Sequence, residues 1–132
     1  MQTPHIMPAE AYDKLKASAE KYGGVGSGML SVQGAPFCIL GHAYTAQVLD
    51  IEPPSAEDLH VWPFLIKPRV QDVYRATPAS VQRVFGDAGP GETYRRNDRI
   101  VDGALMDLGL GISARIPFET WAEKFGVVRG EG

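Results

Sequence analysis

The sequence predicts an α+β fold in which about five short helices pack around one small β-hairpin and share a single core. Three segments begin at a proline and end at a glycine, which is the usual punctuation of short helices. One pair of short apolar runs flanks a glycine turn, which is typical of a hairpin. The chain has 132 residues, so we expect residues 1–132 to form one domain.

The proline-to-glycine segments are predicted helices at residues 8–22, 78–85 and 117–125. Proline suits a first helical turn because its missing N–H has no intrahelical partner there, and glycine suits the residue after a helix. Thr77 is the expected N-cap of the second helix. The third helix has the apolar spacing of a buried face, with Phe118, Trp121, Ala122 and Phe125 at i, i+3, i+4 and i+7.

The other elements follow from weaker patterns. Residues 29–32 and 36–40 form the expected hairpin around Gly34, and residues 41–49 the helix after it. A further helix is expected from Asn97 or Asp98 to Leu108, with a broad apolar face that consists of Ile100, Val101, Ala104, Leu105 and Leu108. Residues 22–28 are rich in glycine but lack Gly-Lys-Ser/Thr, so they indicate a helix stop and a mobile connection rather than a phosphate loop.

Composition and charge argue against several classes of protein: disordered, nucleic-acid-binding, secreted and membrane proteins. Hydrophobic residues make up 44% and charged residues 22% of the chain, which argues against disorder. The net charge of −3 disfavours a nucleic-acid binder, although basic residues outnumber acidic ones between residues 61 and 101. With one cysteine the chain forms no internal disulfide, and it shows neither a signal peptide nor an apolar run long enough for a bilayer. We therefore expect a cytoplasmic protein without membrane association.

Cys38 and His42 are the candidate catalytic pair, because residues four apart share one face of a helix. A thiol near a helix N-terminus is more acidic, and histidine could act as its base. The alternative is a buried thiol beside a hydrogen-bonded histidine. A metal site would need this pair together with His60, His5 or Asp58; since zinc sites usually show two close ligand pairs, we predict no metal and no cofactor.

Two further groups are candidates for partner binding. Arg95, Arg96 and Arg99 gather at the expected start of a helix, where an anion or an acidic partner would offset their charge. The alternative is a set of surface ion pairs with Glu92, Asp98 or Asp102. Trp62 and Phe64 lie in an apolar run within a proline-rich loop at residues 50–68, which either caps the core or forms an exposed docking patch.

Several short motifs together resemble an uncharacterised family of small proteins from actinobacteria and their phages. The matching residues are Leu15 and Ala19 in the first helix, Gly28 and Leu30, Cys38 and Gly41, and the Asn97-Asp98 pair. This resemblance covers about two-thirds of the chain in pieces. It implies a compact, mostly helical fold and an origin in a mobile element, and it implies no activity.

The sequence therefore predicts a non-catalytic protein-binding module, such as an accessory protein or inhibitor of a phage or mobile element that docks on a host protein. Arg95, Arg96, Arg99, Trp62 and Phe64 are its expected contact residues. A small enzyme built on Cys38 and His42 is the alternative. A binder of nucleic acid or another anion through the arginines of residues 95–99 is a weaker alternative.

Overall fold

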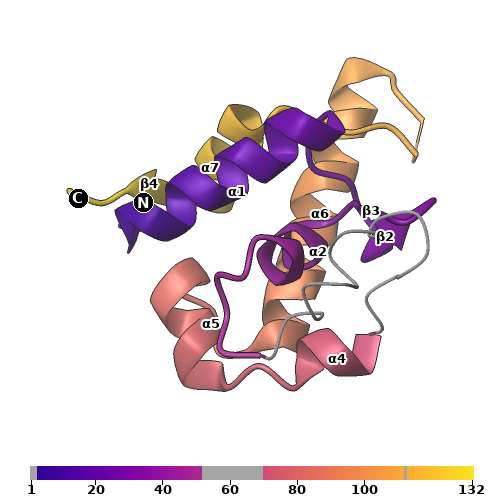
Figure 1. The fold of residues 1–132 in the computed structure, drawn as a ribbon. Helices are drawn as coiled ribbons and strands as arrows, with labels where there is room; N and C mark the ends of the chain where they lie inside the picture. The colour runs from indigo at the N-terminus through magenta and orange to yellow at the C-terminus, as the bar shows by residue number, and fades with distance from the viewer. Residues whose placement is uncertain (1–2, 52–69, 112) are drawn as a thin grey trace.

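The structure, a computed structural model, describes residues 3–51, 70–111 and 113–132 (Figure 1). Its elements in chain order are β1 (His5–Met7), α1 (Ala9–Tyr22), β2 (Ser31–Val32), β3 (Ala35–Pro36), α2 (Ile39–Thr45), α4 (Val70–Tyr74), α5 (Pro78–Phe85), α6 (Pro90–Leu108), α7 (Phe118–Phe125) and β4 (Val127–Arg129). Helices and short strands surround one apolar cluster, which confirms the predicted α+β class and its single core.

The three helices predicted from proline and glycine are α1, α5 and α7, and each is confirmed to within one residue at either end. Thr77 caps α5 as expected, since its Oγ1 accepts a hydrogen bond from the Ser80 N–H at 3.2 Å. Gly86 ends that helix with a φ of +81°, a left-handed conformation that favours glycine. These helix ends could be predicted from the sequence because helix capping depends on residues that are close together in the chain.

The predicted hairpin is present but shorter, with β2 and β3 pairing antiparallel. Its two turn residues, Gln33 and Gly34, have φ values of +53° and +82°, as a tight two-residue hairpin turn requires. The return strand ends at Pro36, and helix α2 spans Ile39–Thr45 instead of the predicted residues 41–49. The prediction was wrong here because a short apolar run such as residues 37–40 fits a strand and a buried helix equally well.

Helix α6 begins at Pro90, seven residues before the expected start at Asn97. Gly89, Pro90 and Gly91 resemble a loop in sequence, but Pro90 occupies the first helical turn, where its missing N–H costs nothing. Arg95, Arg96 and Arg99 consequently lie within the helix and not at its first residues, although the guanidinium of Arg95 reaches back to Gly91 in the first turn. The three side chains therefore do not gather around a helix N-terminus, which was the reason to expect an anion beside them.

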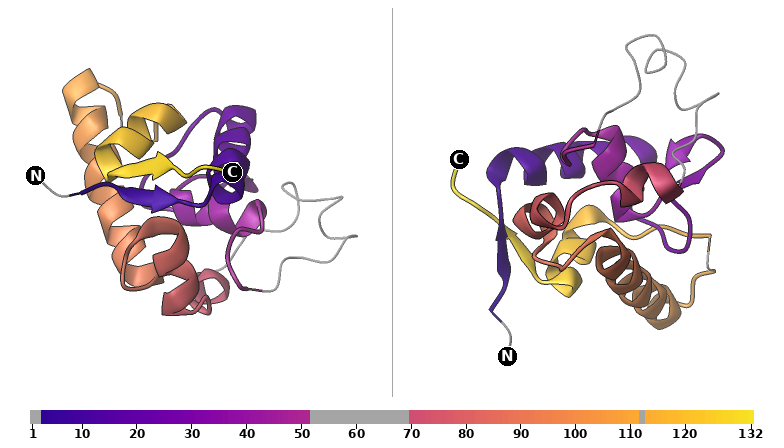
Figure 2. Two further views of the ribbon diagram at one scale, coloured as in Figure 1. Left: turned by 90° about the vertical axis from the view of Figure 1, so that its left-hand side faces the viewer. Right: turned by 90° about the horizontal axis from the view of Figure 1, so that it is seen from below.

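The two ends of the described chain meet in a parallel pair of strands that the sequence analysis did not predict. Strand β1 pairs with β4 in the register His5 with Val127 and Met7 with Arg129, and Figure 2 shows the two strands side by side. Strands of three residues are too short to show a period of two, so their pairing partner cannot be recognised from the sequence.

The middle of the glycine-rich segment after α1, residues 24–27, is buried and packed against other parts of the chain. Val25 exchanges backbone hydrogen bonds with Ile116 at 2.8 and 2.9 Å. The Phe37 ring lies directly against Gly26, so that a side chain at this position would collide with it. Glycine is therefore required here by close packing.

Asn97 connects most of these parts from the buried face of α6. Its Oδ1 accepts hydrogen bonds from the Trp121 Nε1–H of α7 at 3.0 Å and from the Ile39 N–H of α2 at 3.4 Å. Its Nδ2 donates to the carbonyl of Gly26 at 3.0 Å and to Asp98 Oδ1 at 3.2 Å. One fully buried amide thus joins α6 to two helices and to the glycine-rich segment.

We expect Asn97→Asp to lower the free energy of unfolding by about 3 kcal/mol, because it removes the donor to the Gly26 carbonyl and buries a charge beside Asp98. Denaturant unfolding followed by circular dichroism measures the change. Gln82→Glu, the same amide-to-acid change at an exposed position of α5, is the control and should change stability by less than about 0.5 kcal/mol. Equal effects of the two substitutions would contradict this role of Asn97.

Candidate functional site

Cys38, the first member of the predicted catalytic pair, is the N-cap residue of α2 and is fully buried. Burial raises the pKa of its thiol to about 12, and the backbone N–H groups of Gly41 and Leu40 offset this only in part. At neutral pH the thiol is protonated and shielded from solvent. This geometry corresponds to the alternative of a buried, unreactive cysteine.

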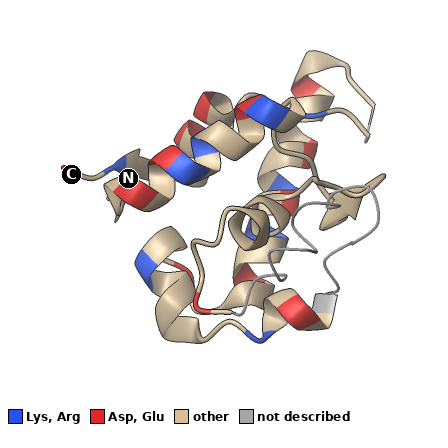
Figure 3. Cartoon of the chain, in the orientation of Figure 1, with Lys and Arg blue, Asp and Glu red and all other residues tan. Residues whose placement is uncertain are grey.

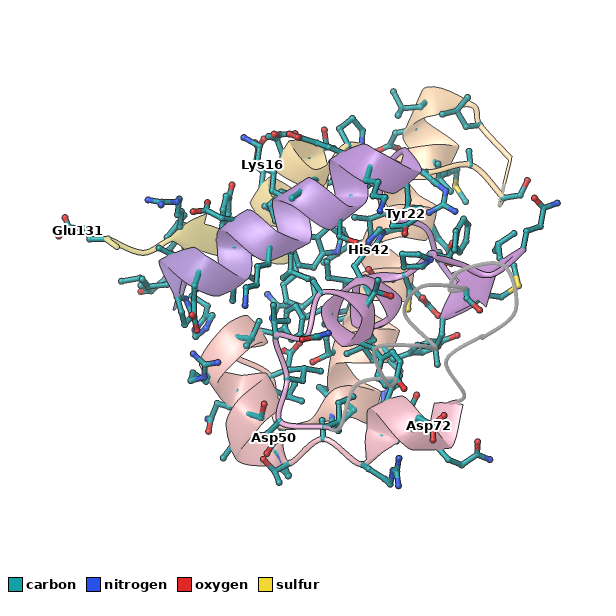
Figure 4. The ribbon with its side chains drawn as sticks, in the orientation of Figure 1. Lys16, Tyr22, His42, Asp50, Asp72 and Glu131 are labelled. Carbon is teal, nitrogen blue, oxygen red and sulfur yellow. The ribbon has the colours of Figure 1, made fainter. Side chains whose placement is uncertain are left out.

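His42, the second member of the pair, uses both ring nitrogens elsewhere. Its Nε2–H donates to the Gly24 carbonyl at 2.9 Å, which leaves Nδ1 to accept from the Ser18 hydroxyl at 2.7 Å. Figure 4 shows the ring between α1 and α2, close to Tyr22. Burial is the main reason that the pKa of His42 is lowered to about 4; the hydrogen bond to the Gly24 carbonyl opposes this shift and the nearby Arg115 adds to it. The imidazole is therefore neutral and joins α1, α2 and the glycine-rich segment.

The structure separates the three predicted contact arginines. Arg96 packs inward: its Nη1 is 2.9 Å from Asp87 Oδ1, its Nη2 donates to the carbonyl of Phe125, and its guanidinium lies 4.1 Å from the centroid of the Phe125 ring. It attaches α6 to α7, so a partner would have to compete for it. Arg95 and Arg99 are exposed, and Arg95 forms an ion pair with Glu92 at 2.9 Å.

Arg99 belongs to a continuous exposed surface that we name the α6 outer face. It consists of the exposed residues on the side of the helix opposite the core, which are Arg95, Arg99, Asp102, Gly103, Met106 and Asp107. Figure 3 shows that both signs of charge occur along this helix. Among the residues that the structure describes, Arg99 and Asp107 have no ion-pair partner, so both charges are available to another molecule.

The C-terminal end of this surface is apolar. Met106 is 79% exposed, and Leu110, just beyond the helix, is 49% exposed. Leu108 is also 61% exposed, but it lies on the opposite side of the helix, in line with the buried Ala104. Asp102, Leu105, Met106 and Leu110 line a hollow of about 350 Å³. Leu108 was expected on the buried face of the helix, and this prediction is wrong, because the last turn of α6 extends beyond the core that would cover it (Figure 1).

Gly103 lies in the middle of the α6 outer face and has no local structural reason to be glycine. A Cβ at this position would meet no atom of the described residues within 4 Å. Glycine inside an exposed helix costs about 1 kcal/mol relative to alanine. Gly103 is visible in the sequence as a glycine within a helical apolar pattern. Such a glycine points to a contact surface only when the structure shows that no described side chain packs against it.

The remaining predicted contact residues, Trp62 and Phe64, lie outside the described part of the chain, as do the candidate ligands His60 and Asp58. His5 lies in β1, where its Nε2–H donates to the Arg83 carbonyl at 3.0 Å. Among the described residues, no three His, Cys, Asp or Glu side chains come together as a metal site would require. No described helix is both long and apolar enough to cross a membrane.

Comparison of the chain with protein-family models, with curated proteins and with solved structures finds no match. The resemblance to small proteins of actinobacteria and their phages therefore stays a prediction.

We expect native Cys38 to react with a thiol reagent at pH 7 at least ~100-fold more slowly than in the denaturant-unfolded chain, because the folded thiol is buried and its pKa is about 12. Stopped-flow measurement with an aromatic disulfide reagent gives both rates. A native rate equal to or above the unfolded rate would restore the catalytic alternative.

His42 makes stability depend on pH between its folded pKa of about 4 and its ordinary value of 6.5. In this interval the unfolded chain binds a proton that the folded chain does not. This contribution is fully present above pH 6.5 and decreases as the pH falls, by about 1.4 kcal/mol per pH unit. Denaturant unfolding at a series of pH values measures the slope. In His42→Asn, whose side chain does not titrate, the free energy of unfolding should change less with pH over this interval. An unchanged slope would show that His42 does not cause the pH dependence.

Proposed function

We propose that this chain is a non-catalytic module that binds protein, and that the α6 outer face is its docking surface. The observation that carries the proposal is the pair of exposed apolar residues Met106 and Leu110 on the same surface as Arg99 and Asp107, which form no ion pair with any described residue. Apolar centres with a polar rim are the usual anatomy of protein interfaces. A role as an accessory protein of a phage or mobile element rests on the sequence resemblance alone.

The exposure of its side chains favours the α6 outer face over the site of Cys38 and His42, which is buried. Met106 is among the side chains favoured at interfaces because its flexible thioether adapts to irregular partner surfaces. Leu110, just past the end of the helix, is 49% exposed and lines a hollow together with Met106. Exposed apolar side chains that gather beside a hollow are typical of a surface that binds another molecule.

The geometry gives the alternatives less support. An enzyme built on Cys38 and His42 would need an ionisable, accessible thiol and a free imidazole nitrogen. The thiol is buried, and both ring nitrogens of His42 are hydrogen-bonded to Ser18 and Gly24. An anion binder would need several free arginines, but Arg96 is paired with Asp87 and Arg95 with Glu92.

The proposal predicts that Met106→Asp abolishes binding to protein without unfolding the module, because the substitution places a charge in the apolar centre of the face. The measurement is capture by the tagged module from a lysate of the cells that encode it, with nuclease added, quantified by mass spectrometry. We expect at least ~10-fold less captured protein than with the unsubstituted chain, equivalent to about 1.4 kcal/mol of binding free energy.

Lys124→Glu is the matched control, since Lys124 is exposed on α7 and lies away from the α6 outer face. It should leave the captured protein unchanged. Thermal unfolding of both variants verifies that each is folded. Capture that is equally strong with Met106→Asp and with the unsubstituted chain would exclude this face as the docking surface.

A further inference from the structure

We infer that the occupant of the α6 outer face is a second copy of this chain, with the two α6 helices crossing antiparallel at Gly103. The inference rests on the proposed function, because it names the partner of the same surface. It is carried by three properties of α6: the position of its glycine, the order of its charges and the location of its apolar end.

Gly103 is the point at which another helix can come closest. It is exposed, and the space where its Cβ would lie is empty. A missing side chain lowers the ridge of the helix, so two backbones can approach there more closely than at any neighbouring position. A closely packed second helix gives a reason for glycine that the described residues of one copy do not give.

The charges of α6 are arranged symmetrically about this glycine. Arg99 lies four residues before Gly103 and Asp107 four residues after it, so the three residues share one ridge of the helix. When two copies cross antiparallel at Gly103, Arg99 of each copy lies opposite Asp107 of the other. A parallel crossing would instead place Arg99 against Arg99. The surface is therefore complementary to itself under a two-fold rotation, which is the symmetry of a homodimer.

The same crossing covers the exposed apolar residues. The C-terminal end of one α6, with Met106 and Leu110, then lies along the N-terminal half of the other, where Arg95 and Arg99 are exposed. The aliphatic stems of arginines cover apolar surface while their guanidinium groups stay in water. Figure 2 shows α6 along the outer side of the molecule, where a second copy can approach it.

Sedimentation equilibrium over the micromolar range tests the inference through a charge exchange. Arg99→Asp and Asp107→Arg each place like charges across the interface at both symmetric positions, and each should weaken the dimer about tenfold or more. The double variant, R99D with D107R, restores opposite charges at both positions. We expect its dimerisation constant to return to within about threefold of that of the unsubstituted chain.

Two substitutions of Gly103 distinguish an effect on the contact between the two helices from an effect on the stability of one copy. Gly103→Leu should abolish the dimer because its side chain fills the contact between the helices. Gly103→Ala should raise the melting temperature of the dilute monomer, since alanine favours a helix and meets no neighbour within one copy. Lys124→Glu again serves as the control for charge reversal elsewhere and should leave the dimerisation constant unchanged.

The outcomes separate this inference from the proposed function. A dimer that both single reversals weaken and the double variant restores supports the inference. A chain that stays monomeric, or a dimer insensitive to these substitutions, overturns it. If the monomeric chain still captures another protein in a Met106-dependent manner, the inference fails and the proposed function stands. If the monomeric chain captures nothing, both fail.

Discussion

The buried amide of Asn97 is the interaction on which the arrangement of the other elements depends. Three of its four hydrogen bonds connect α6 to the N-terminus of α2, to the indole of Trp121 on α7 and to the carbonyl of Gly26, and the fourth joins it to the neighbouring Asp98. Because the three connected partners are withdrawn from water, an arrangement that separated them would leave polar groups buried and unpaired. The amide therefore determines where α2, α7 and the glycine-rich segment lie relative to the long helix.

Some of the residues that the sequence suggested as reactive or binding groups make internal contacts that hold the fold together. His42 satisfies the Gly24 carbonyl and the Ser18 hydroxyl, and Arg96 attaches α6 to α7 through Asp87 and the Phe125 ring. Burial makes the Cys38 thiol less acidic and the His42 imidazole less basic, which is the reverse of what catalysis by this pair would require. On the outer face of α6, in contrast, arginine, aspartate, glycine and methionine are exposed.

The candidate site was predictable only in part. Arg95 and Arg99 were recognised as exposed cations and are exposed. Arg96 differs from them because the register of α6 turns it towards α7, and this register depends on a helix start at Pro90 that the neighbouring glycines obscured. Leu108 was predicted to be buried because apolar residues at helical spacing usually face a core, and Met106 was not recognised as a contact residue. Whether such residues are buried depends on how far the helix extends beyond its core.

The sequence by itself determined the α+β class, the ends of α1, α5 and α7, the turn of the hairpin and the buried face of α7. These features depend on caps, turn residues and periodicity, which act between residues close together in the chain. Only the tertiary structure decided the pairing of β1 with β4, the burial of Cys38 and His42 and the exposure of the α6 outer face. Burial and pairing arise between segments far apart in sequence, and no local pattern specifies which segments come together.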